Sequence, residues 1–363
     1  MRGLGISVYP NANNIEEIIA YIDKAAHYGF SRIFTCLISA EGSMEAVVDQ
    51  FKRVLAAANR HQMRVVSDIS PDVFEKLQLK PDQLDFFKEL GLWGIRLDLG
   101  FSGMEESFMT YHPSGLKIEL NMSNGTKYVD NILSYQANTS NLIGCHNFYP
   151  HRYTGLSREH FTKCSEQFKQ LNLRTAAFVS SSSADHGPWP VNEGLCTLEE
   201  HRRLPIEVQA KDLFQTGLID DVIIGNAFAS DEELKALGQL NRDLLELQIE
   251  ILPGIDDIER KILLEEPHFN RGDVSEYMIR STQSRVKYKG HYFKPRTVKD
   301  MAPGDVLIES SLYERYAGEL QVALKAMENT GKTNIVARVI ESERFLLQSI
   351  KPWQKFKFVE YKG

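Results

Sequence analysis

The sequence predicts an α/β protein, a (β/α)8 TIM barrel followed by a small, mostly β domain. Eight short apolar segments alternate with helical patterns over about the first 250 residues, which is typical of an eight-stranded barrel. The first strand–helix turn, VYPNANN, lacks the GxGxxG pattern of doubly wound nucleotide-binding sheets. Beyond Leu252 the pattern changes to short β-rich runs separated by glycine turns.

The expected barrel strands are short apolar runs, most of them followed by polar or turn-forming residues. They lie at residues 4–9, 32–39, 64–70, 94–100, 116–124, 142–148, 174–180 and 220–226. Successive side chains of a strand point to opposite faces, so each run also predicts which side chains enter the barrel.

The helices between these strands are expected from apolar stripes and from capping patterns. The first stripe has the i, i+3, i+4, i+7 spacing of a helix face and consists of Ile15, Ile18, Ile19, Ile22 and Ala26. Asn13 or Asn14 is expected to cap its start, and Gly29 fits its end. Residues 197–200 and 230–233 match the S/T-x-x-E capping box, and each is expected to begin a later helix.

The change of pattern divides the chain into parts. We expect a barrel domain at residues 1–252, a linker at 253–269 and a β-rich domain at 270–363. The expected strands of the last part are the runs YMIRST, RVKYKGHYF, GDVLIES, GELQVAL, NIVARVI and FKFVEY. Their spacing predicts a small barrel or sandwich that is mostly antiparallel.

Charge and hydropathy exclude several classes of protein. The chain of 363 residues has 42 basic and 49 acidic side chains, a formal net charge of -7, which argues against nucleic acid as a partner. No run approaches the roughly 20 apolar residues that span a bilayer, so we expect no membrane segment.

The cysteines and the N-terminus indicate a cytoplasmic protein. The four cysteines are far apart in the sequence and form no CxxC motif, so we expect free thiols rather than disulfides or a zinc site. The first ten residues, MRGLGISVYP, lack the long apolar stretch and cleavage site of a signal peptide.

Three consecutive strands are each expected to direct a carboxylate into the barrel. In GIRLDLG the apolar residues share one parity, which leaves Arg96 and Asp98 facing inward, and the same alternation turns Asp68 and Glu119 inward. Neighbouring strands lie about 4.8 Å apart, so these acids are expected roughly 5–10 Å from one another. That spacing suits the acid pair of a glycosidase, or a divalent metal site. Glu119 has an alternative role as the internal partner of Arg96 or Lys117.

Polar and aromatic residues follow the fifth and sixth strands, at the barrel end where active sites lie. Asn121 and Ser123 have inward parity, and His146, Asn147 and Tyr149 form a dense group that is typical of sugar binding. His146 is alternatively a hydrogen-bonded structural histidine.

Further candidates for substrate binding lie on the loops after the sixth and seventh strands and at the end of the eighth. A long loop rich in serine carries Trp189, which we expect to close over a substrate. Arg152 and Arg202 are candidate ligands of an anion, Arg202 being alternatively part of a solvated helix surface. Asn226, which ends the eighth segment, completes the candidate binding set.

Several runs between positions 3 and 230 resemble a bacterial family long described as uncharacterised "outer surface proteins". They are LGISVYP, FSRIFTCLIS, IRLDLGF, KIELNMSN, GCHNFYPHRYTGLS, GLCTLEEHR and DDVIIGNAFAS. The characterised members of this family are 6-phospho-N-acetylmuramidases of cell-wall recycling, with a TIM barrel followed by a cyclophilin-like C-terminal domain.

The resemblance implies a glycoside hydrolase that cleaves 6-phospho-N-acetylmuramyl-N-acetylglucosamine in the cytoplasm, to N-acetylmuramic acid 6-phosphate and N-acetylglucosamine. The substrate is then a small phosphorylated amino-sugar disaccharide, and no cofactor or metal is required. Its acetamido group can itself attack the anomeric carbon, with one carboxylate orienting the acetamide and another protonating the leaving oxygen.

Two alternative functions remain open from the residues. One is another phosphosugar-processing barrel enzyme, either an aldolase that uses Lys117 or an epimerase with metal ligands such as His146, Asp68 and Asp98. The other is a non-catalytic carbohydrate-binding protein, which binds sugar tightly without turnover.

Overall fold

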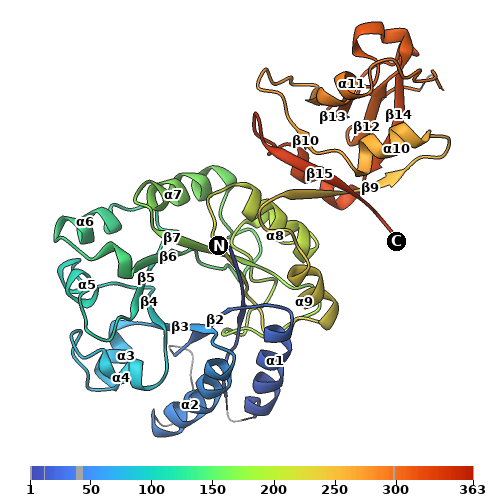
Figure 1. Ribbon diagram of the computed structural model, residues 1–363. Coiled ribbons are helices and arrows are strands. Elements are labelled where there is room, and N and C mark those ends of the chain that lie inside the picture. Colours follow the sequence, from blue (N-terminus) through green and yellow to red (C-terminus); the bar gives the residue numbers. More distant parts are fainter. Residues whose placement is uncertain (1, 12, 38–43, 297–298, 363) are drawn as a thin grey trace. The chain divides into compact units, whose positions relative to one another are not determined.

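The computed structural model describes residues 2–11, 13–37, 44–296 and 299–362. Its contacts divide the chain into two compact units, residues 1–240 and 241–363. Figure 1 shows the first unit as a ring of strands surrounded by helices α1 to α9. No described helix is long and apolar enough to cross a membrane.

The first unit is a closed barrel of eight parallel strands that pair in sequence order, and β8 closes onto β1. This confirms the predicted TIM barrel, with each strand within about three residues of its expected bounds. The strands are β1 Gly3–Ser7, β2 Arg32–Cys36, β3 Arg64–Ile69, β4 Gly94–Leu97, β5 Lys117–Asn121, β6 Leu142–Cys145, β7 Arg174–Val179 and β8 Asp221–Ile224.

Helices and short 3-10 turns connect the strands and cover the outside of the barrel. They are α1 Ile15–His27, α2 Met44–Arg60, α3 Pro71–Lys76, α4 Asp85–Glu89, α5 Met104–Met109, α6 Tyr128–Ser134, η1 Thr139–Asn141, α7 Arg158–Gln170, η2 Glu199–His201, α8 Ile206–Gln215 and α9 Asp231–Gly238. Outward strand residues such as Ile6, Ile118 and Leu120 are fully buried against these helices. A separate apolar cluster fills the inside of the barrel and includes Phe34, Phe178 and Ile223.

The capping predictions had mixed outcomes. Ser230 and Glu233 form the expected capping box at the start of α9. The prediction at residues 197–200 was wrong, because the Thr197 hydroxyl accepts from the Phe178 N–H and donates to the Asn147 carbonyl instead. Asn14 stands at the N-cap of α1, but its side chain accepts from the Asn11 N–H and donates to the Tyr9 carbonyl. It therefore caps no backbone amide of the helix. A tertiary contact replaces capping at Thr197, and a local turn before the helix replaces it at Asn14.

The second unit is one seven-stranded sheet in the order β10-β15-β9-β14-β12-β13-β11, and it forms a nearly closed barrel. All its pairings are antiparallel except β9 with β15. Its elements are β9 Leu245–Ile251, α10 Asp257–Leu264, β10 His268–Phe269, β11 Met278–Ser281, α11 Gln283–Lys287, β12 Asp305–Glu309, η3 Ser311–Tyr316, β13 Leu320–Ala323, β14 Thr333–Val339, η4 Glu341–Glu343, α12 Arg344–Leu347 and β15 Lys355–Glu360.

Two expectations for this part of the chain need correction. The expected linker, 253–269, holds α10 and β10, and the division between the units falls before Asn241 instead of after Leu252, because β9 pairs with β14 and β15. The run RVKYKGHYF is no strand. Residues 283–287 form the short helix α11, in which Ser284 is buried and Val286 is exposed.

Candidate active site

Arg96 of β4 joins two carboxylates at the C-terminal end of the barrel. Its Nη1 donates to Oδ1 of Asp68 at 2.9 Å and to Oδ1 of Asp98 at 3.1 Å. The two oxygens therefore lie within about 6 Å of each other. Asp68 pairs with Arg96 in the register of β3 and β4, whereas Asp98 follows the end of β4 and lies closer to solvent, 39% exposed against 13% for Asp68.

Burial separates the behaviour of the two acids. Desolvation raises the pKa of Asp68 to about 6, the charge of Arg96 lowers it less, and the nearby charge of Asp98 raises it further. Among the described residues, no protein group donates to Oδ2 of either aspartate. A proton held by Asp68 therefore belongs on Oδ2, since Oδ1 already accepts from Arg96.

A cavity of about 100 Å³ lies beside this pair. Strand ends and the loop after β7 line it with polar groups and aromatic rings: Phe34, Cys36, Asp68, Arg96, Asp98, Asn147, Phe148, Phe178, Pro188 and Trp189. Phe34, Phe148 and Phe178 pack edge to face, with ring centroids 5.0–6.0 Å apart. This combination of apolar rings and a few convergent polar groups is typical of a small-molecule site.

Residues at and after the ends of the fifth and sixth strands support the acid pair through hydrogen bonds. Not all of them line the cavity. Asn121 donates to Oδ1 of Asp98 at 3.1 Å, and Asn147 accepts from Nη2 of Arg96. Ser123 links them, since its backbone N–H donates to Asn121 and its hydroxyl accepts from the Asn147 N–H. Tyr149 is half-buried nearby, and burial raises the pKa of its hydroxyl.

His146 is a structural histidine in its contacts. It is fully buried, its two ring nitrogens lie 3.2 Å and 2.9 Å from the hydroxyls of Ser123 and Ser165, and its ring packs on Phe161. Burial lowers its pKa to about 3, so the ring is neutral at pH 7. The epimerase alternative required His146 to join Asp68 and Asp98, and these contacts direct it elsewhere.

Glu119 lies deeper than the two aspartates. It is fully buried and pairs with Arg32, while its distance to Arg96 Nε is 4.0 Å. It is not among the residues that line the cavity. The expected partner Lys117 donates instead to Ser140 and Asn141, beside the start of β6. That is the N-terminal end of the barrel, far from where an aldolase would need its amine.

Arg202 ties two loops together and has little capacity left for a ligand. Its side chain is 7% exposed, and it forms a double hydrogen bond with Glu199 at 2.6 Å and 2.7 Å. Its Nη1 also donates to the carbonyls of Tyr149, Glu193 and Gly194. The arrangement fixes the loops after β6 and β7 against each other. This role differs from both expected ones, which were a ligand of an anion and part of a solvated helix surface.

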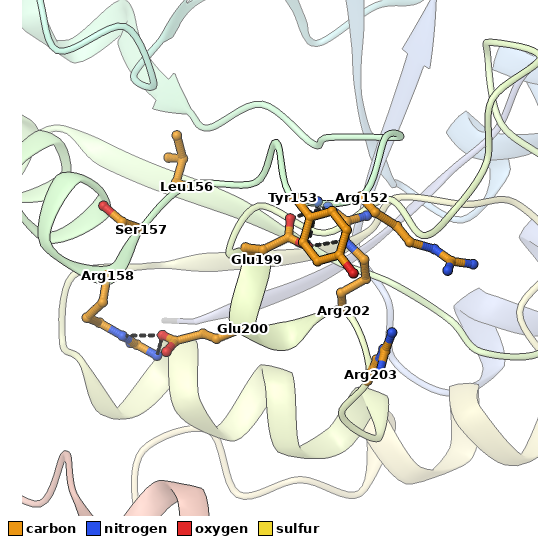
Figure 2. Close-up of a pocket in the computed structure, with 9 residues that line it drawn as sticks. All are labelled: Arg152, Tyr153, Leu156, Ser157, Arg158, Glu199, Glu200, Arg202 and Arg203. Atoms are coloured by element: carbon orange, nitrogen blue, oxygen red, sulfur yellow. Dashed lines mark hydrogen bonds and ion pairs between the residues drawn. The ribbon is translucent and has the colours of Figure 1, made fainter.

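Arg152 lies at a second, larger pocket of about 550 Å³ (Figure 2). Its side chain is 52% exposed and meets Glu193 at 3.1 Å. Figure 2 shows the ion pair of Arg158 and Glu200 at one end of this pocket and Glu199 beside Tyr153 at the other. Arg203, also exposed, lines the same pocket.

The loop that carries Trp189 is anchored at both ends. Asn226 is buried, and its side-chain amide accepts from the Ser181 N–H and donates to the carbonyls of Ser181 and Ala184. Glu233 accepts from three consecutive serines at the start of the loop, and Arg202 holds its far end. Trp189, 46% exposed, lies between these anchors and forms one wall of the cavity. Asn226 therefore shapes the loop and has no free polar group for a substrate.

Sequence reasoning did not assign some residues that the structure brings to the site. Arg96 was expected to face inward only as a possible partner of Glu119, and Phe34, Cys36 and Phe178 were not singled out as lining residues. The signal was present, because Phe34 and Cys36 share the inward parity of Arg32 on β2. Pro188 lies on an irregular loop, where no periodicity indicates direction.

A (β/α)8 barrel with two carboxylates paired at its C-terminal end is an arrangement that a barrel glycosidase can use. The family model described as 6-phospho-N-acetylmuramidase, N-terminal, matches residues 4–239, and its C-terminal counterpart matches residues 245–359. The chain belongs to the 6-phospho-N-acetylmuramidase family and is a glycosidase.

Two solved structures resemble the whole chain. An uncharacterized protein of B. cereus is 50% identical, with a TM-score of 0.92 and 99% of both chains covered. A conserved protein of unknown function from Enterococcus faecalis is 28% identical, with a TM-score of 0.72, and covers 99% of this chain and 97% of its own. No curated protein matched the chain.

Proposed function

We propose that the chain hydrolyses 6-phospho-N-acetylmuramyl-N-acetylglucosamine during cell-wall recycling, releasing N-acetylmuramic acid 6-phosphate and N-acetylglucosamine. The observation that carries this proposal is the pair Asp68 and Asp98 on one nitrogen of Arg96. The family supplies the reaction class, and the pair supplies the two groups of opposite protonation that the reaction needs.

In this proposal Asp68 is the general acid. Its carboxyl holds a proton to about pH 6, and the proton on Oδ2 passes to the glycosidic oxygen as the bond to the anomeric carbon breaks. Cleavage leaves Asp68 as a carboxylate beside Arg96, which stabilises the charge that forms. The same carboxylate then accepts a proton from the attacking water in the second step.

Asp98 remains a carboxylate, held by Arg96 and Asn121. The two Oδ1 atoms lie at most about 6 Å apart, which is shorter than the roughly 6.5–9.5 Å between carboxyl groups that inversion requires to fit a water. We therefore propose retention, with Asp98 orienting the substrate acetamide for attack on the anomeric carbon.

The 6-phosphate is proposed to bind at the pocket of Figure 2, through Arg152 and Arg203, which both line it. The loop after β6 connects the two places, because it brings Asn147 to the cavity and Arg152 to this pocket. In this proposal Arg202 does not bind the phosphate, and it contributes by holding the loops after β6 and β7 in position. The four described cysteines are buried and form no disulfide bond, which supports a reducing, cytoplasmic setting.

The cavity of about 100 Å³ is smaller than the roughly 300–1,000 Å³ of typical ligand sites. We propose that the part of the loop between its anchors, with Pro188 and Trp189, moves outward to admit the disaccharide. Trp189 then packs against a sugar face when the loop returns.

The decisive experiment incubates the purified chain with the disaccharide, with and without its 6-phosphate, and detects the released sugars. Release from the phosphorylated disaccharide alone supports the proposal. Equal release from both forms would contradict the phosphate requirement, and binding without release would favour the carbohydrate-binding alternative.

A further inference from the structure

The second unit has a cavity of its own, of about 620 Å³. It lies between α11 with the turn that follows it and the end of η3, residues 314–317. All its lining residues belong to the unit 241–363, so the cavity does not depend on the barrel. Its volume falls within the roughly 300–1,000 Å³ of sites for small molecules.

Several side chains of the cavity wall are held in place by the domain. Arg285 pairs at 2.7 Å with Glu319, which is fully buried, and its guanidinium lies 5.3 Å from the ring centroid of Tyr316. The Tyr288 hydroxyl donates to Glu266 at 2.7 Å, and His291 Nε2 lies 3.0 Å from Asp256. A wall fixed in this way loses little conformational entropy when a ligand binds.

Two cations at the cavity contrast with this fixed wall. Lys289 and Arg315 are exposed, and in the part of the chain that the structure describes neither side chain has an ion pair or hydrogen bond. Glu314 is the one carboxylate among the described lining residues. The cavity therefore presents an excess of positive charge, although the whole chain has a net charge of -7.

Aromatic rings accompany these cations. Tyr316 is 43% exposed at the cavity, and Tyr313, 40% exposed, lies 6.0 Å from it between ring centroids. Glu314 between them has φ 35° and ψ -93°, a conformation that is unfavourable for a residue with a side chain. Backbone strain of this kind is concentrated at functional sites.

We infer that this cavity binds an anionic sugar, with the sugar ring against Tyr316 and the anionic group between Lys289 and Arg315. Tyrosine faces hold pyranose rings, and ammonium and guanidinium groups hold phosphate or carboxylate. This is a binding site separate from the cleavage site, and it is independent of which glycosidic bond the barrel hydrolyses.

Calorimetric titration of the full chain tests the inference with N-acetylglucosamine 6-phosphate as the probe. The wild type is compared with Lys289→Ala/Arg315→Ala and with Lys355→Ala, which removes an exposed lysine of β15 in the same domain. Any binding to the barrel is common to all three and cancels. We expect a binding component that is at least tenfold weaker in the double variant and unchanged in Lys355→Ala. Identical isotherms in all three proteins would overturn the site.

Further arms of the titration test the ligand class. Inorganic phosphate and neutral N-acetylglucosamine are each expected to bind at least tenfold more weakly than the sugar phosphate, and Tyr316→Leu is expected to weaken binding more than Tyr316→Phe. Phosphate that binds as tightly as the sugar phosphate would overturn the sugar contact. A basic surface with tyrosines is also found on RNA-binding proteins. If single-stranded RNA binds tightly and the double variant loses this binding, the ligand is a nucleic acid and the sugar assignment is overturned.

Discussion

Two clusters of charged side chains within the same barrel have opposite balances of cations and carboxylates. At the N-terminal end, Arg32, Arg64 and Arg174 all pair with Asp221, and Arg32 also pairs with Glu119, so cations exceed carboxylates. At the C-terminal end, Arg96 alone serves both Asp68 and Asp98, so carboxylates exceed cations.

The balance determines what each acid can do. Burial opposes ionisation of Asp221, but the hydrogen bonds and charges of its arginines outweigh it and lower its pKa to about 2. At the other end burial is the larger effect, and the pKa of Asp68 rises to about 6. Similar residues therefore form an ionised support in one place and, in the other, an acid with a raised pKa, which we propose as the proton donor.

Asp68→Asn is expected to have the largest effect on activity. Removing a general acid typically costs about 10²–10⁴-fold in rate, and the amide keeps the hydrogen bond to Arg96. The measurement is kcat/KM on the phosphorylated disaccharide, with circular dichroism to establish folding. Asp98→Asn is expected to lose a similar factor. Turnover at the wild-type rate in both variants would rule out the pair.

Glu119→Gln is expected to act on stability instead. Breaking a buried ion pair costs about 3–5 kcal/mol, because Arg32 then lacks one of its two carboxylate partners. Chemical denaturation measures the change in unfolding free energy. The rate per folded molecule should stay within tenfold of wild type. A stable variant without activity would move Glu119 into the catalytic group.

The raised pKa of Asp68 predicts a pH dependence. Its protonated form is the acid, so kcat/KM should fall above about pH 6, and Asp98→Asn should move this fall to lower pH because the Asp98 charge helps to raise the pKa. A rate that stays constant to pH 8 would exclude Asp68 as the acid.

The same group links pH to stability. The folded chain holds the Asp68 proton more tightly than the unfolded chain, whose pKa is near 3.8. Its contribution is thus complete below pH 3.8 and is lost as pH rises to about 6, an effect of about 3 kcal/mol. Wild type should therefore lose stability relative to Asp68→Asn over this range. Parallel stability curves for the two proteins would contradict the assignment.

The sequence predicted the barrel well because its rules are local. Alternation along a strand indicated that Asp68, Asp98 and Glu119 face inward, and strand order indicated that they are neighbours. Depth was harder to predict, because it depends on where each strand ends and on the reach of long side chains. Arg32 begins on β2 and extends to Glu119 on β5, a contact that no spacing in the sequence indicates.

The roles of the loop residues were the hardest to predict. Arg202 and Asn226 are polar and lie near strand ends, as ligand-binding residues do, yet both bond the backbone of loops distant in sequence. Likewise β9 alternates like any strand, and only its pairing with β14 and β15 assigns it to the second unit. Such outcomes depend on tertiary contacts, which composition and periodicity do not contain.

Arg152→Ala is expected to have the smallest effect, and it separates the role of Arg152 from that of Arg202, which lines the same pocket. A charged hydrogen bond contributes about 1.5–3 kcal/mol when buried, but Arg152 is 52% exposed, so a smaller contribution of about 1–1.4 kcal/mol applies. KM for the phosphorylated disaccharide should rise about 5- to 10-fold with kcat little changed. Arg202→Ala, which releases both loops, should instead lower the melting temperature and reduce kcat.

Two comparisons make the Arg152 prediction specific to the phosphate. Arg60→Ala removes an exposed arginine on α2, remote from this pocket in the sequence, and is expected to leave KM unchanged. The unphosphorylated disaccharide has no phosphate for the guanidinium to bind. Arg152→Ala should therefore leave KM for any residual turnover of this substrate at the wild-type value. An equal rise in KM for both disaccharides would mean that Arg152 shapes the loop after β6, as Arg202 does, and that the phosphate binds elsewhere on the barrel.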